Sequence, residues 1–200
     1  MTKTLQLAVL VINFAALVYI ANFTFRRKRA LVFEILRGIR VWHVVIALPT
    51  LVTVVLTGIT LSQVDFLAWS WWQAIGGEGN ASTGFTSGGN ILAPLFVALL
   101  IAILPFAAWS EESSFRKGAE NWGIGKLLRN SIGFGLVHLT AGLSLAYCSG
   151  VALAGIIFAL VYRYMYSKSK DQDLAVLAST RVHTCYNYTV AIFLVLLLFF

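Results

Sequence analysis

Charged residues are scarce in this chain of 200 residues, because Asp, Glu, Lys and Arg together make up only 12%. A soluble domain is about a quarter charged and about half apolar, whereas 59% of this chain is hydrophobic. No polar stretch is long enough to form a separate water-soluble domain. The composition excludes a soluble globular enzyme, a disordered tail and a coiled coil. It indicates a chain that lies almost wholly in a membrane.

Cysteine is scarce as well. The chain has two cysteines, Cys148 and Cys185, and their spacing fits neither a metal site nor a redox motif. A disulfide framework is therefore not supported. We expect both cysteines to be small, partly apolar residues within helices.

Acidic residues are few, since eight Asp and Glu stand against fifteen Lys and Arg, for a net charge of +7. In a soluble protein such a balance indicates nucleic-acid binding. In a membrane protein it indicates topology, because basic residues collect in cytoplasmic loops. We therefore expect no nucleic-acid partner and a lipid bilayer as the surroundings.

Long apolar runs separated by short polar segments predict an all-α fold, a polytopic membrane helix bundle with about six transmembrane helices. We interpret residues 1–200 as a single membrane domain. The six predicted spans cover residues 5–25, 41–62, 91–117, 126–146, 151–165 and 179–200. A tight turn is expected at residues 147–150, a short connector at 119–125 and a charged loop at 167–173.

Basic residues fall almost entirely on one side of this arrangement. The segments after the first, third and fifth spans carry six, four and four Lys or Arg, and Lys3 is the remaining one. The positive-inside rule then predicts both termini on the non-cytoplasmic side. Residues 63–90, with a Gly-rich stretch from 76 to 90, become an outer loop. An interfacial basic helix within residues 26–40, near anionic lipid, is left open.

Several polar residues lie where a membrane helix is expected. Glu111 and Glu112 follow an apolar run with no polar linker, His138 lies in the fourth span, and His183 and Asn187 lie in the sixth. The helical rise places them all in the cytoplasmic half. A charge at the centre of a membrane helix costs about 2.5–3.5 kcal/mol, so such residues by default indicate a functional site that faces the bundle interior.

Helical spacing adds detail to this site. Glu112 and Arg116 are four residues apart and are predicted to pair, and Phe134 and His138 share a face. Glu111 points about 100° away from Glu112, so one carboxylate is free to react while the other is structural. Each group alone has a simpler role, as an interfacial charge or an interhelical hydrogen bond. Their gathering on one side of the membrane, from three helices, favours a common site.

Three short motifs carry a resemblance to a known family. Residues Glu111–Arg116 match Glu-Glu-x-x-x-Arg, residues Phe134–His138 match Phe-x-x-x-His, and residues His183–Asn187 match His-x-x-x-Asn. In this order and spacing the chain resembles the CAAX-protease and bacteriocin-processing family, also called the Abi family, over residues 91–195. The first motif of that family often ends in Arg-Gly, whereas Lys117 separates the two residues here.

The resemblance implies a glutamic-type intramembrane endopeptidase without a cofactor. By this resemblance Glu111 and His138 activate a water, and His183 and Asn187 stabilise the oxyanion of the tetrahedral intermediate. The groups that orient the site are then Glu112, Arg116 and Phe134. The expected substrate is a membrane-tethered or lipidated peptide or protein, cleaved near the cytoplasmic face, and we favour a bacterial peptide or sorting-tail processor in the inner membrane.

Other interpretations stay open at this point. A non-catalytic membrane subunit, acting in immunity, as a chaperone or in assembly, is the main alternative. A divalent metal held by Glu111, His138 and His183 also fits the residue types. A proton-coupled transporter is disfavoured because no inverted repeat is visible. The sequence leaves the oligomeric state open, and with it any membrane-protein partner.

Overall fold

The computed structural model describes residues 2–75 and 92–199, and every regular element within these ranges is a helix. This confirms the predicted all-α class, while the Gly-rich outer loop predicted at 76–90 lies outside the described residues. The first range holds α1 (Thr2–Arg27), α2 (Arg29–Arg37), α3 (Val41–Leu61), α4 (Asp65–Ala68) and α5 (Trp71–Ala74). The second holds α6 (Leu92–Phe115), η2 (Ala119–Asn121), α7 (Ile124–Val137), η3 (His138–Ala141), α8 (Leu145–Ser169) and α9 (Gln172–Phe199).

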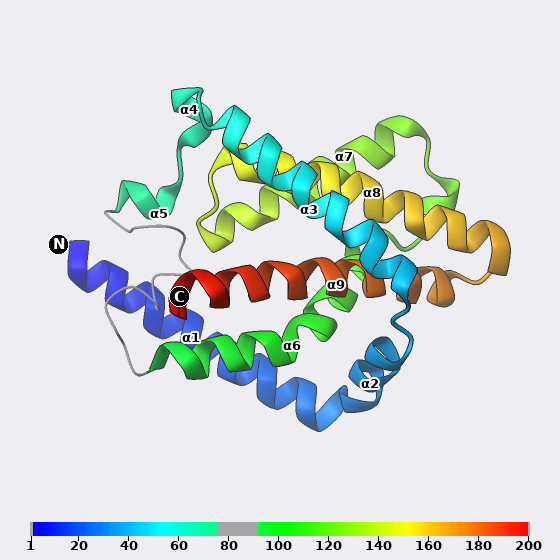
Figure 1. Cartoon of the computed structure of the whole chain (residues 1–200), viewed down its shortest axis with the longest axis horizontal. Coiled ribbons are helices and arrows are strands. Elements are labelled where there is room, and N and C mark those ends of the chain that lie inside the picture. Colours follow the sequence, from blue (N-terminus) through cyan, green and yellow to red (C-terminus); the bar gives the residue numbers. More distant parts are fainter. Residues whose placement is uncertain (1, 76–91, 200) are drawn as a thin grey trace.

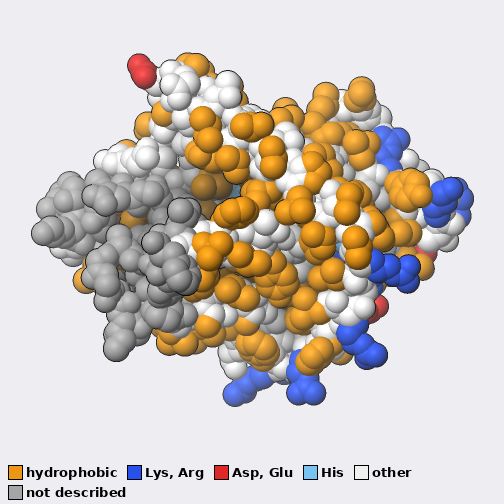
Figure 2. Space-filling model, in the orientation of Figure 1, with side chains coloured by type: hydrophobic (Ala, Val, Ile, Leu, Met, Phe, Trp, Pro, Cys, Tyr) orange, Lys and Arg blue, Asp and Glu red, His pale blue; other side chains and the backbone are white. Residues whose placement is uncertain are grey.

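Four helical stretches are long and apolar enough to cross a membrane. They are Leu7–Arg27, Val41–Leu61, Val97–Asn121 and Leu145–Ser169. On the face shown in Figure 2, hydrophobic side chains cover the middle of the molecule, and Lys and Arg lie along its right and lower edge. This distribution is typical of a membrane protein. The predicted count of six spans, and the side on which the termini lie, stay predictions.

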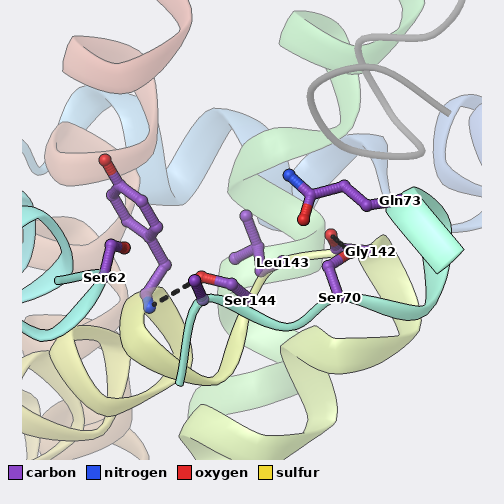
Figure 3. A pocket seen from close by; sticks show the side chains of 8 residues that line it. Ser62, Ser70, Gln73, Gly142, Leu143 and Ser144 are labelled. Carbon is purple, nitrogen blue, oxygen red and sulfur yellow. Dashed lines mark hydrogen bonds between the residues drawn. The ribbon is translucent and has the colours of Figure 1, made fainter. Parts of the chain in front are cut away.

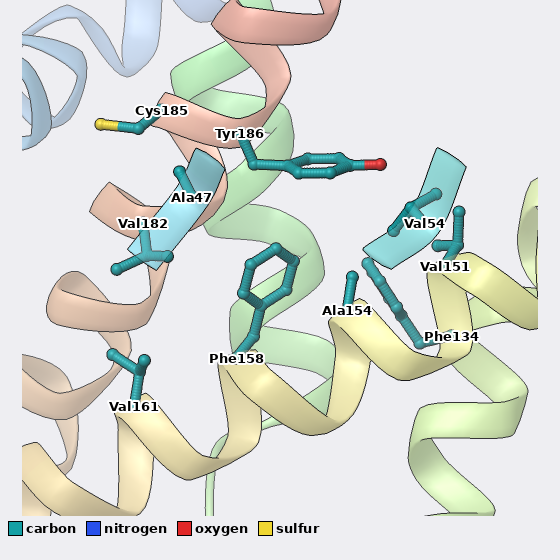
Figure 4. Close-up of a cluster of buried hydrophobic side chains, with 10 residues drawn as sticks. All are labelled: Ala47, Val54, Phe134, Val151, Ala154, Phe158, Val161, Val182, Cys185 and Tyr186. Atoms are coloured by element: carbon teal, nitrogen blue, oxygen red, sulfur yellow. The ribbon is translucent and has the colours of Figure 1, made fainter. Parts of the chain in front are cut away.

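Helix α9 packs against α3, α6 and α8, while α1 packs on α6 and α7 packs on α8 (Figure 1). The start of α1 and the end of α9 lie at the same end of the molecule, and α2 and the α8–α9 turn lie at the opposite end. The largest hydrophobic cluster joins α3, α7, α8 and α9 (Figure 4). Its members are Ala47, Val54, Phe134, Val151, Ala154, Phe158, Val161, Val182, Cys185 and Tyr186.

The predicted fourth span, 126–146, is wrong as one continuous helix. Helix α7 ends at Val137, and the 3-10 helix η3 continues the chain to Ala141. Gly142 then adopts the left-handed region, with φ 78°, which glycine enters without a Cβ penalty. The side chain of Ser144 accepts a hydrogen bond from Tyr147 N and caps α8. The turn between these helices therefore lies at residues 142–144.

The predicted turn at residues 147–150 is wrong for a related reason, because this segment is the first part of α8. Its glycine is needed for packing instead of for a turn. A Cβ on Gly150 would lie 2.7 Å from the carbonyl oxygen of Val54 on α3. Glycine thus allows α3 and α8 to approach closely, as small residues do between membrane helices. Both cysteines are free and buried, Cys148 in α8 and Cys185 in α9, as expected.

The charged loop predicted at 167–173 is much shorter than expected. Helix α8 continues to Ser169, and Lys170 ends it in the left-handed region, with φ 58°. The carboxylate of Asp171 then accepts hydrogen bonds from the backbone N–H groups of Asp173 and Leu174. These bonds cap α9, so α9 begins seven residues before the predicted sixth span.

The close approach of α3 and α8 predicts that two Gly→Ala substitutions differ in their effect on the free energy of unfolding. Gly150→Ala forces the α3 and α8 backbones apart and should lower the free energy of unfolding by about 1–3 kcal/mol. Gly125→Ala on α7 meets nothing within 4 Å and should be neutral or stabilise by up to about 1 kcal/mol. Denaturant unfolding of the purified protein in detergent measures both. Equal effects of the two substitutions would contradict the packing role of Gly150.

Candidate functional site

The two adjacent glutamates lie in the last turns of α6 and differ in exposure. The side chain of Glu112 is fully buried, with 0% exposed, whereas that of Glu111 is 36% exposed. The rotation of about 100° between neighbouring helical positions accounts for this difference. Both side chains nevertheless reach the same residue, His183 of α9.

Glu112 has three partners from two helices. Its Oε2 lies 3.7 Å from Nε of Arg116, one turn further along α6, which confirms the predicted pair. The hydroxyl of Ser179 on α9 donates to the same oxygen. Oε1 contacts Nδ1 of His183 at 3.0 Å. Arg116 and His183 are also buried, at 1% and 2% exposure, so this cluster links α6 to α9 through groups that water does not reach.

His183 lies between the two carboxylates, one at each ring nitrogen. An ionised carboxylate only accepts hydrogen bonds, so Nδ1 carries the proton that it shares with Glu112. On the other side, Nε2 lies 3.5 Å from Oε2 of Glu111. That distance exceeds the normal range of 2.7–3.2 Å for an N–H···O hydrogen bond. Oε2 of Glu111 is buried and has no hydrogen-bond partner among the described residues.

Aromatic rings fix the imidazole of His183 in place. The ring of Phe158 on α8 stacks on it, with centroids 4.6 Å apart and planes at 20°. Phe134 of α7 meets it edge to face, with centroids 5.6 Å apart. Phe134 also lies beneath the guanidinium of Arg116, 4.4 Å from the ring centroid. Phe134 and Phe158 both belong to the cluster in Figure 4, so the core and the polar site share residues.

His138 lies at the end of α7, where the α-helix becomes η3. Its Nδ1 donates to the backbone carbonyl of Phe134 at 2.8 Å, because a carbonyl oxygen only accepts. In the neutral ring Nε2 is then free of a proton. The His138 ring also meets the Phe134 ring at 5.0 Å. Within the described residues no hydrogen bond or ion pair joins His138 to Glu111, so Phe134 is the contact between His138 and the rest of the cluster.

Asn187 follows His183 by one turn of α9 and is half-buried. Its side-chain amide makes no hydrogen bond within residues 2–75 and 92–199, and it is available to a ligand. The structure therefore brings Glu111, Glu112, Arg116 and His183 into direct contact. It leaves Asn187 one turn away.

Three residues of this site were missed by the sequence analysis. They are Ser179, Phe158 and Gly155. Ser179 precedes His183 by four residues, so its place on the same helix face was a usable signal. Phe158 gave no such signal, because an apolar residue in an apolar helix is ordinary. A Cβ on Gly155 would lie 3.1 Å from Nη2 of Arg116, so glycine leaves room for the guanidinium.

No group of three or more His, Cys, Asp or Glu side chains in the described part of the chain is arranged to hold a metal ion. The contacts give a physical reason within the cluster. Glu111 and Glu112 lie at opposite nitrogens of the His183 ring, so the two carboxylates and one ring nitrogen do not converge on a single point.

Two cavities among the described residues are lined by side chains outside the cluster. One, of about 430 Å³, lies between α3, α5 and the start of α8 and has no charged lining residue (Figure 3). The other, of about 320 Å³, lies between α7 and α8 and is almost wholly apolar. It includes Ser131, whose Cα is close to Gly155 and so to the guanidinium of Arg116. The second cavity is therefore adjacent to the candidate site.

Comparison of the chain with protein families, curated proteins and solved structures finds no match.

The buried ion pair predicts a non-additive response to substitution. Arg116→Met leaves the Glu112 carboxylate buried without its counter-charge and should lower the free energy of unfolding by about 3–5 kcal/mol. Arg116→Met combined with Glu112→Gln removes both charges and should cost clearly less than Arg116→Met alone. Chemical denaturation of wild type, Arg116→Met, Glu112→Gln and the double variant in detergent tests this. A double variant that loses the sum of the two single effects would show that the pair is not coupled.

Proposed function

We propose that this protein is an intramembrane endopeptidase that cleaves a membrane-tethered or lipidated peptide or protein. The observation that carries the proposal is the gap between Glu111 and His183. A buried carboxylate oxygen that has no hydrogen-bond partner in the described part of the chain faces a ring nitrogen at 3.5 Å. A water that lies beside two polar atoms at this separation can bridge them, and a water held by a carboxylate is the nucleophile that amide hydrolysis needs.

In the proposed reaction Glu111 takes a proton from the water while the water oxygen attacks the scissile carbonyl. The side-chain amide of Asn187 donates to the oxyanion that forms, while Nε2 of His183, whose ring proton is on Nδ1, accepts a hydrogen bond from the attacking water. Glu111 then passes the proton to the amide nitrogen as the C–N bond breaks. His183 keeps its orientation because Glu112 holds its Nδ1 at 3.0 Å. Water is the only co-reactant in this sequence.

His138 has a second role in this proposal. Its Nδ1 is occupied by the carbonyl of Phe134, so Nε2 is the basic nitrogen of the ring. We assign it to the water together with Glu111, as the three sequence motifs and their resemblance to the CAAX-protease and bacteriocin-processing family imply. Substrate binding then brings the water, Glu111 and His138 together, since catalytic contacts often tighten only in the complex.

The surroundings of the site support a substrate that lies in the membrane. The apolar cavity between α7 and α8 is adjacent to Arg116 and offers space for a lipid chain or an apolar segment. In the proposed topology six helices span the bilayer and both termini are outside, so the site lies in the cytoplasmic half. A bacterial inner membrane fits this arrangement.

A non-catalytic role in immunity or assembly is the second candidate, and one observation favours it. Glu112, Arg116, Ser179 and His183 are all buried and join α6 to α9, so the cluster also holds helices together. In that case the intact protein binds a partner and does not cleave it.

Substitution of Glu111 separates these candidates. Glu111→Gln removes the general base and should reduce cleavage by about 10²–10⁴-fold, while the protein still inserts and unfolds at the wild-type temperature. The assay compares wild type with the variant in liposomes on a library of membrane-tethered peptides, with products identified by mass spectrometry. Asp65→Asn, an exposed carboxylate on α4, is the matched control and should cleave like wild type.

Full cleavage by Glu111→Gln would contradict the role of this residue. Absence of cleavage by every protein, together with a partner that co-purifies with wild type and is lost from Glu111→Ala, would favour the assembly role. Activity that survives a chelator would count against a metal-dependent reaction.

A further inference from the structure

The junction between α2 and α3 is strongly basic. Arg37 ends α2, and Arg40 directly precedes α3. Arg181 of α9 reaches this junction, where its Nη2 donates to the backbone carbonyl of Glu34 at 3.3 Å. A Cβ on Gly38 would overlap the guanidinium of Arg181. The guanidinium therefore lies directly against the α2–α3 turn.

Two buried donors at the α3–α9 interface have no acceptor within residues 2–75 and 92–199. Nδ1 of His43 lies 2.8 Å from the backbone N of Arg40 and 3.1 Å from the carbonyl oxygen of the same residue. The shorter contact requires Nδ1 to accept, which places the proton of the neutral ring on Nε2. His43 is only 2% exposed, and its Nε2 finds no partner among the described residues. Nε of Arg181 is also a buried atom that has no hydrogen-bond partner among the described residues. Buried donors are normally satisfied, so these two indicate that an acceptor binds here.

The charges at the junction favour an anion as that acceptor. Arg181 interacts electrostatically with Arg40 and with His43. Glu34 is the acidic residue that interacts with Arg181, but no ion pair within 4 Å joins these two in the described part of the chain. The junction thus has three positive side chains, Arg37, Arg40 and Arg181, against one negative side chain, Glu34. It therefore has an excess of positive charge.

The position of the junction identifies the source of the anion. One candidate membrane span ends at Arg27 and the next begins at Val41, so α2 connects them at a membrane surface. Phe33 of α2 is exposed and lies beside Arg29, whose guanidinium carbon is 5.8 Å from the ring centroid. An aromatic ring next to a basic side chain is typical of a helix at the lipid headgroups. Lys and Arg also mark this edge in Figure 2.

We propose that the α2–α3 junction is a binding site for the phosphate of an anionic phospholipid. Nε of Arg181 and Nε2 of His43 donate to the phosphate oxygens, and Arg40 supplies counter-charge. Arg40 is exposed and Arg181 is half-buried, so the headgroup approaches the junction from the surface. Nε of Arg181 and Nε2 of His43 are buried in the free protein, so these side chains turn towards the phosphate when it binds. Guanidinium groups suit phosphate because their donors match its oxygens. The site does not depend on the proposed hydrolysis, since Glu111 takes no part in it.

A lipid titration tests the proposal on the full chain in detergent micelles. The unfolding temperature is followed as phosphatidylglycerol or phosphatidylcholine is added, because a ligand of the native state raises it. Wild type should respond to phosphatidylglycerol, whereas the quaternary ammonium of phosphatidylcholine is repelled by the arginines. Arg181→Gln and His43→Gln should each need about tenfold more phosphatidylglycerol. Arg129→Gln, which removes an exposed charge on α7, is the matched control and should respond like wild type.

A second arm replaces lipid with inorganic phosphate, against chloride at equal ionic strength. A full response to phosphate alone would overturn the assignment to lipid. Equal responses of all four proteins to phosphatidylglycerol would overturn the site itself. If Arg181→Gln fails to fold, the site is tested with His43→Gln and with a ³¹P NMR measurement of lipid bound to wild type. The result expected is one motionally restricted phosphatidylglycerol per chain, and the absence of any restricted lipid would contradict the proposal.

Discussion

The buried ion pair between Glu112 and Arg116 is the interaction on which the rest of the site depends. Two charges removed from water are tolerable only when further hydrogen bonds and packing satisfy them. Ser179 and His183 on α9 supply those bonds to Glu112. The guanidinium of Arg116 donates from Nη1 to the carbonyl of Phe115 and lies on the face of Phe134, while its Nε and Nη2 have no hydrogen-bond partner among the described residues. The pair on α6 therefore requires hydrogen-bonding side chains on α9 and an aromatic side chain on α7.

This constraint also separates the two adjacent glutamates. Because the carboxylate of Glu112 already contacts Arg116, Ser179 and His183, its role is structural. Glu111 has a buried oxygen with no hydrogen-bond partner among the described residues, and this oxygen faces Nε2 of the same imidazole. Two rigid acceptors, Oε2 of Glu111 and Nε2 of His183, lie 3.5 Å apart and form a place for a water that donates to both. The proposed hydrolysis follows from this separation of roles.

Sequence reasoning was most successful where a local rule applies. Helical spacing was enough to predict the Glu112–Arg116 pair, and apolar length was enough to predict α3. It failed where tertiary packing decides, since Gly150 looks like a turn residue until its contact with Val54 is known. The same limit hid Phe158, whose stacking on His183 depends on the crossing of α8 and α9. Long-range contacts of this kind leave no periodic signal in a single sequence.

The most direct test of this account is the proton position on His183, measured by ¹⁵N NMR of histidine-labelled protein. The chain has three histidines, so single substitutions assign each signal. The account predicts a proton on Nδ1 of His183, shared with Glu112, and an unprotonated Nδ1 on His43 as the internal contrast. An unprotonated Nδ1 on His183 would contradict it, because the Glu112 carboxylate only accepts hydrogen bonds and would then not hold the ring.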